Sequence, residues 1–112
     1  MAQQLLELAK TTITTTSVAI ITVPANQIWE VQNIFVAQPS TGVAKEVVIG
    51  RGTLTTAADT DGIIRRNWAA GIQSENIYAP IALIAAATLD VIASLGTGEA
   101  TVAVYGYKTL LT

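Results

Sequence analysis

The chain has 112 residues, of which 51% are hydrophobic and 12% charged, and its formal net charge is −2. A domain of this size buries a core without crosslinks. The absence of Cys and His excludes disulfides, the usual zinc sites, and Ser–His and Cys–His nucleophiles. The composition is too apolar for a disordered chain and lacks the positive charge that nucleic acid attracts. With so few charges, we expect partners to cover part of the surface.

Membrane insertion and export are not predicted. A transmembrane helix takes about 20 continuous apolar residues. The longest candidate, residues 78–88, is shorter and contains Pro80. The first ten residues lack the basic start and the cleavage site of a signal peptide. The sequence therefore predicts a protein that is made and used without export and has no membrane partner.

Residues 1–10 differ from the rest of the chain. Leu5, Leu6 and Leu8 lie among Gln and Glu, a pattern that allows one or two helical turns. An isolated helix this short needs a partner surface, and a frayed terminus is the alternative. The Thr-rich residues 11–17 that follow are either a strand or the lead-in to one.

Residues 18–38 predict two apolar strands, 18–23 and 27–38, joined by a tight turn. Pro24 has the φ angle of the first central position of a type I turn, and Asn26 tolerates the left-handed region. Residues 24–26 therefore favour a three-residue hairpin loop.

The second of these strands changes phase in its middle. Its alternation fails near Gln32 and Asn33, which predicts a β-bulge or a bend. The Trp29 end and the Phe35 end should then face different neighbours. We expect Phe35 to lie in the core and Trp29 to contribute chiefly to assembly.

Shorter strand-like runs, separated by turn residues, fill the rest of the chain. The total of seven or eight strands predicts an all-β fold, an antiparallel β-sandwich or jelly roll. No helical crossover long enough for a parallel sheet is present, which excludes the α/β classes. The chain would consist of an N-terminal arm, residues 1–16, and one β-sandwich domain, residues 17–112. The further predicted strands are residues 44–50, 62–68, 77–84, 88–95 and 100–108.

The sequence predicts no catalytic residue, metal site or cofactor site, and hence no enzyme. The acidic residues are scattered, so no carboxylate pair is indicated. Residues 59–62, Asp-Thr-Asp-Gly, begin like a calcium loop, but Ala70 stands at its twelfth position and a plain Asx-turn is favoured. The basic residues of the middle of the chain should be solvated at strand edges: Lys45, Arg51, Arg65 and Arg66.

The aromatic residues allow two interpretations. Trp29, Trp68, Tyr78, Tyr105 and Tyr107 could form a platform on which sugar rings stack. Packing in the core or at a subunit interface is the favoured interpretation.

Three segments together carry a resemblance to a known group of proteins. They are the Thr-rich lead-in with the turn Val23-Pro24-Ala25-Asn26, the late strand at residues 88–94 and the last strand at residues 102–107. Over about residues 12–108 the series resembles small β-sandwich virion proteins of tailed bacteriophages. Ala86-Ala87 stands where that pattern usually has Gly-Asp, so the turn before Thr88 is expected to differ.

The resemblance implies a structural virion protein that decorates or cements the capsid. It would be made in the host cytoplasm, lie on the capsid surface of the virion, bind the major capsid protein and form a homo-oligomer, with a trimer favoured. The arm would reach an adjacent subunit. The alternative is a tail or fibre component that binds host carbohydrate. The expected interface residues are Leu5, Leu6, Leu8, Trp29, Trp68 and Tyr78.

Overall fold

The protein is all-β, as the alternating pattern predicts. The computed structural model describes residues 5–57, 62–94 and 97–111, which contain eight strands and no helix. The strands are β1 (Leu6–Thr14), β2 (Val18–Thr22), β3 (Gln27–Gln38), β4 (Lys45–Arg51), β5 (Gly62–Trp68), β6 (Gln73–Leu83), β7 (Thr88–Ala93) and β8 (Thr97–Leu110).

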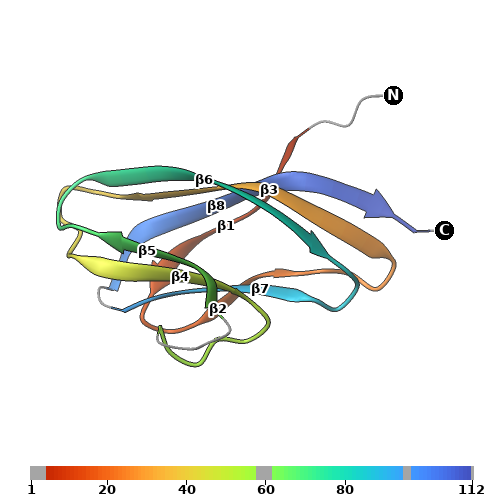
Figure 1. Ribbon diagram of the computed structural model, residues 1–112, viewed down its shortest axis with the longest axis horizontal. Coiled ribbons are helices and arrows are strands. Elements are labelled where there is room, and N and C mark those ends of the chain that lie inside the picture. The colour runs from red at the N-terminus through yellow and green to blue at the C-terminus, as the bar shows by residue number, and fades with distance from the viewer. Residues whose placement is uncertain (1–4, 58–61, 95–96, 112) are drawn as a thin grey trace.

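The strands form two packed antiparallel sheets (Figure 1). Sheet A has the order β1-β8-β3-β6 and sheet B the order β2-β7-β4-β5. β1 pairs with β8, β2 with β7, β3 with β6 and β4 with β5. Each of the first four strands therefore pairs antiparallel with one of the last four. This is the strand order of an eight-stranded jelly roll.

The core lies between the sheets and follows the two-residue period of the strands. In β7, Leu89, Val91 and Ala93 point into the core, whereas Asp90 and Ile92 lie on the other face of the strand. Burial of each large aliphatic side chain contributes about 1.5–3 kcal/mol. The largest fully buried core side chains are Ile13, Ile21, Val31, Ile34, Val36, Val47, Ile49, Leu83 and Leu89.

The predicted bulge in β3 is confirmed. The register shifts between Val31 and Asn33 against both neighbouring strands, β6 and β8. Gly106 pairs with Val31 at this point, and a Cβ added to Gly106 would lie 1.9 Å from the carbonyl oxygen of Glu30. Only glycine therefore fits the close approach of the two backbones.

The bulge decides which side chains of β3 face the core, and the expectation for Phe35 is wrong. Ile34 and Val36 are fully buried, so Phe35 between them points outward and is 42% exposed. Trp29 lies before the bulge, packs against the core and is half-buried. Its Nε1 donates to Gln27 Oε1 over 2.7 Å, and Lys108 Nζ lies 4.3 Å from its ring centre.

The expected hairpin at residues 24–26 is also wrong. β2 belongs to sheet B and β3 to sheet A, so these residues form a corner between the sheets. The Gln27 N–H donates to the Pro24 carbonyl over 3.2 Å, which places Ala25 and Asn26 at the central positions of the turn. Among the described non-glycine residues, only Ala86 has a positive φ. A short turn does not fix whether the two strands share a sheet.

The first strand replaces most of the expected arm. β1 pairs with β8 from Leu6, opposite Gly106, to Thr14, opposite Thr97. No helical turn is present between residues 5 and 10, and residues 1–4 lie outside the described part. The sandwich thus begins at β1 and not at residue 17, because pairing with β8 supplies the partner that a short apolar segment needs.

The outer face of sheet B is covered by the loop that follows β4. Leu54 of this loop is 2% exposed and packs on Val48 and Ile92, which are equally buried. Asp90 lies under the same loop, where its Oδ2 accepts hydrogen bonds from the Ser17 hydroxyl (3.0 Å) and the Leu54 N–H (3.2 Å). The predicted loop is therefore part of the packed structure.

Candidate interaction surfaces

The outer face of sheet A carries aromatic side chains on three neighbouring strands. Its residues follow from the register, which sets two rows of cross-strand neighbours over β1, β8, β3 and β6. The first row is Glu7, Tyr105, Asn33 and Tyr78, and the second row is Lys10, Ala103, Phe35 and Asn76. We call these eight residues the sheet A face.

Two shallow hollows lie on the sheet A face, because small residues separate the larger ones. One has a volume of about 450 Å³ and is lined by Leu5, Asn33, Phe35, Asn76 and Tyr105. The other has a volume of about 360 Å³ and is lined by Lys10, Phe35, Ala37, Thr101, Ala103 and Tyr105. Phe35 and Tyr105 line both hollows and form the ridge between them.

Within these two rows, charge lies only on the edge strand β1, and the next exposed charge on the outer face is Glu30 of β3, opposite Tyr107. Glu7 and Lys10 both lie on the edge strand β1, and the other six residues of the two rows are uncharged. Asn33 Nδ2 donates to Asn76 Oδ1 over 3.3 Å, so two exposed amides are linked between the aromatic rings. Tyr78 at the opposite edge is 70% exposed. The face therefore suits an uncharged partner surface.

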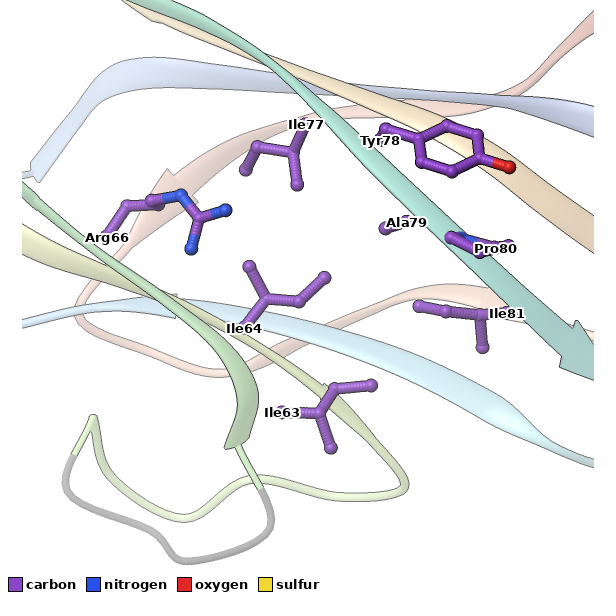
Figure 2. A pocket seen from close by; sticks show the side chains of 8 residues that line it. All are labelled: Ile63, Ile64, Arg66, Ile77, Tyr78, Ala79, Pro80 and Ile81. Carbon is purple, nitrogen blue, oxygen red and sulfur yellow. The ribbon is translucent and has the colours of Figure 1, made fainter.

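A groove of about 300 Å³ runs between β5 and β6, the edge strands of the two sheets (Figure 2). Figure 2 shows Ile64 pointing from β5 towards β6, and Ile77 pointing from β6 towards β5. Ile63 on the rim is 51% exposed. The lining residues are Ile63, Ile64, Arg66, Ile77, Tyr78, Ala79, Pro80 and Ile81.

One end of the groove is charged. Arg66 Nε lies 2.6 Å from Glu75 Oε2, and this ion pair bridges β5 and β6. The Arg66 side chain remains 41% exposed. Pro80 and Ile81 lie at the other end of the groove in Figure 2. Pro80 suits this edge strand because its lack of an N–H removes one donor that a foreign strand would use.

The residues predicted to lie at interfaces divide into three groups. Leu5, Leu6 and Tyr78 are exposed, at 50%, 43% and 70%. Trp29 is half-buried against the core. Leu8 and Trp68 are buried in the core of the single chain, at 8% and 6% exposure.

Among the residues of these two surfaces, sequence reasoning missed the exposure of Phe35 and Ile63. The sequence predicts Phe35 in the core and gives Ile63 only as part of the strand at residues 62–68. The signal for Phe35 was present, because a phase change at Asn33 with Ile34 and Val36 inside leaves Phe35 outside. Ile63 had no such signal, since its exposure depends on β5 lying at an edge of sheet B.

The basic residues take different positions from one another. Lys45, expected at a solvated edge, is 5% exposed, and its Nζ donates to Gln38 Oε1 over 2.6 Å. Arg65 lies 3.5 Å from Glu46, and the exposed Arg51 donates to the Ala82 carbonyl over 3.1 Å. Gln38 Nε2 in turn donates to the carbonyls of Ala69 and Gly71, so Gln38 links Lys45 to the connection between β5 and β6.

Within the described part of the chain, no cluster of three or more acidic, His or Cys residues could hold a metal ion. Asp59 and Asp61, which begin the calcium-like sequence, lie outside the described residues. Nor does that part contain a helix with the length and apolarity needed to span a membrane.

Comparison with known proteins gives a structural likeness and no family. No family model and no curated protein matches the chain. It is similar to the crystal structure of a pentameric capsid protein isolated from metagenomic phage sequences, with a TM-score of 0.35 and 18% identity. The match covers 92% of this chain and 62% of that protein. Values this low assign neither a family nor a function.

Proposed function

We propose that this chain is a structural virion protein of a tailed phage that decorates the capsid and contacts the major capsid protein as a homo-oligomer. The sheet A face carries this proposal. Its two rows are uncharged except at β1, and it exposes Phe35 and Tyr78. Exposed aromatic side chains on one uncharged part of a sheet face are suited to adhesion to another protein surface.

The mechanism would be physical. Burying a side chain such as Phe35 against a partner contributes up to about 1.5–3 kcal/mol. One such face gives modest affinity, because association also costs translational and side-chain entropy. Repetition over many sites of a capsid, together with linkage between copies, converts modest contacts into a stable layer. Binding to the assembled shell and not to its parts would stabilise that shell by mass action.

The decisive test is the location of the protein in intact particles. We expect purified virions of the encoding phage to contain the chain in many copies, and cryo-electron microscopy to place the sheet A face against the capsid. Phe35→Asp should lower occupancy, whereas Thr53→Asp, on the exposed surface of the β4–β5 loop, should not. Absence of the chain from virions, or contact through another face, would overturn the proposal.

One observation favours a second candidate, a carbohydrate-binding module of a tail or fibre. Tyr105, Phe35 and Tyr78 surround the linked amides of Asn33 and Asn76 on a shallow surface. Aromatic faces with amides between them suit a neutral sugar. A glycan array with wild-type protein and Asn33→Ala separates the candidates, since a signal lost in the variant supports the module and a blank array removes it.

A further inference from the structure

Two exposed apolar sites lie on opposite edges of the sandwich. The first is the start of β1, where Leu5 and Leu6 are 50% and 43% exposed and Glu7 is also exposed. The second is the groove between β5 and β6, with Ile63 on its rim and Arg66 at one end. Each site combines aliphatic side chains with a charged group: Glu7 at the start of β1, and Arg66 with its ion-pair partner Glu75 at the groove.

The sheet order prevents these sites from meeting within one chain. β1 and β6 are the two outer strands of sheet A, with β8 and β3 between them (Figure 1). Three strand spacings separate β1 from β6, or about 14 Å. Leu5 and Leu6 therefore cannot enter the groove of their own chain, but those of another copy can.

We propose that copies of this chain associate head to tail, with residues 5–7 of one copy seated in the β5–β6 groove of the next. The lengths match, since three extended residues span about 10 Å and the groove side of β6 from Ile77 to Ile81 spans about 13 Å. Leu5 and Leu6 would contact the isoleucines of the groove.

The charge pattern sets the direction of the segment. Glu7 would lie at the Arg66 end of the groove, where the guanidinium already binds Glu75 at 2.6 Å and remains 41% exposed. Arginine has five N–H donors in a planar fork, so one guanidinium can bind a second carboxylate. Reversed insertion would place Glu7 near Pro80 and Ile81, away from a positive charge.

Such a contact uses two different surfaces and closes into a ring when the rotation between copies permits. It uses Glu7 and Tyr78 at the two edges of the sheet A face and leaves Phe35 and Tyr105 at its centre free. The inference deepens the homo-oligomer of the proposed function and is independent of the contact with the capsid. The oligomer is measured on the isolated protein and capsid binding on particles, and either proposal can therefore fail alone.

Mixing two variants tests the head-to-tail contact directly. Leu5→Ser/Leu6→Ser removes the inserted segment, and Ile63→Ser/Ile64→Ser disrupts the groove. We expect wild type to form a closed oligomer in light scattering and each variant alone to be a monomer. An equimolar mixture should form only one-to-one dimers, because each pair retains one intact contact. A monomeric wild type at its highest soluble concentration, or oligomers in either variant alone, would overturn the proposal.

Charge exchange tests the orientation without relying on apolar substitutions. Glu7→Arg should weaken association at least tenfold, and Arg66→Glu in the same chain should restore it. Thr53→Arg, which adds the same charge on the exposed surface of the β4–β5 loop, is the control and should leave association unchanged. Thermal melts should show that all variants fold. Lack of restoration in the folded double variant would refute the pairing of Glu7 with Arg66.

Discussion

The outer faces of the two sheets differ in what covers them. On sheet B, the loop after β4 places Leu54 over Val48 and Ile92, and all three are at most 2% exposed. On sheet A, no described loop crosses the face, and Phe35 and Tyr78 are 42% and 70% exposed. One face is completed by the chain itself, and the other keeps its apolar side chains in contact with solvent.

This difference is the basis for proposing the sheet A face as a binding surface. Exposed apolar side chains that lie singly are ordinary on protein surfaces, but a continuous group on one sheet face marks an interaction site. On sheet B, the loop after β4 buries Val48 and Ile92, which point outward from the sheet. Substitutions on sheet B should therefore affect folding, whereas substitutions on the sheet A face should affect binding.

The largest effect is expected at Leu54. Leu54→Ala leaves a cavity over Val48 and Ile92 and should lower the free energy of unfolding by about 3 kcal/mol. Chemical denaturation of the purified protein measures this change. Thr53→Ala, next to it on the exposed side of the loop, should change stability by less than about 0.5 kcal/mol. Equal effects of the two would show that the loop does not cover sheet B as described.

Asp90 should rank next, because it links the same loop to β7. Asp90→Ala leaves the Ser17 hydroxyl and the Leu54 N–H without their acceptor, at a cost of about 2 kcal/mol. Asp90→Asn keeps an acceptor oxygen and should cost less. Denaturation curves of the two variants give the order, and a more stable Ala variant would contradict the role of these hydrogen bonds.

A pair of aromatic residues on β3 separates folding from binding. Trp29→Ala removes a half-buried ring and its contact with Lys108, and should cost about 2 kcal/mol of stability. Phe35→Ala should cost less than about 1 kcal/mol but lower particle occupancy at least tenfold. A thermal melt and a particle-binding measurement on both variants suffice. If Phe35→Ala lowered the melting temperature more than Trp29→Ala, the outward position of Phe35 would be contradicted.

The smallest effect is expected at the turn that joins sheet A to sheet B between β6 and β7. The Ala87 N–H donates to the Ile84 carbonyl over 3.0 Å, and Ala86 at the third position has φ +68°. This position favours glycine, so Ala86→Gly should raise stability by about 0.5–1 kcal/mol. Ala85→Gly is the control and should not be stabilising. Thermal melts of the two variants measure these changes in stability. An unchanged melting temperature for Ala86→Gly would show that the turn is unstrained.

Strand positions were largely predictable from local sequence. The ranges expected for β2, β3, β4, β5 and β7 agree with the structure to within one or two residues at each end, because alternation and turn residues act locally. The strand predicted at residues 77–84 begins four residues later than β6, since Gln73 to Asn76 are polar and give no strand signal. They form a strand because β3 pairs with them, from Gln38 opposite Gln73 to Phe35 opposite Asn76.

The candidate surfaces were predictable only in part. Tyr78, Leu5 and Leu6 were expected at interfaces and are exposed, whereas Leu8 and Trp68 are buried. Exposure of an apolar side chain depends on what the rest of the chain places over it. That coverage arises from segments distant in sequence, such as the loop over sheet B, and leaves no local pattern.

By itself, the sequence determined the fold class, most strand boundaries and the bulge in β3. These follow from side-chain periodicity and backbone preferences over a few residues. Only the tertiary structure decided that β2 and β3 separate into different sheets, that β1 pairs with β8, and that Phe35 faces outward. Pairing joins residues far apart in the chain, and a shift of one residue in register exchanges the two faces of a strand. The covered face of sheet B and the open face of sheet A are therefore properties of the folded chain.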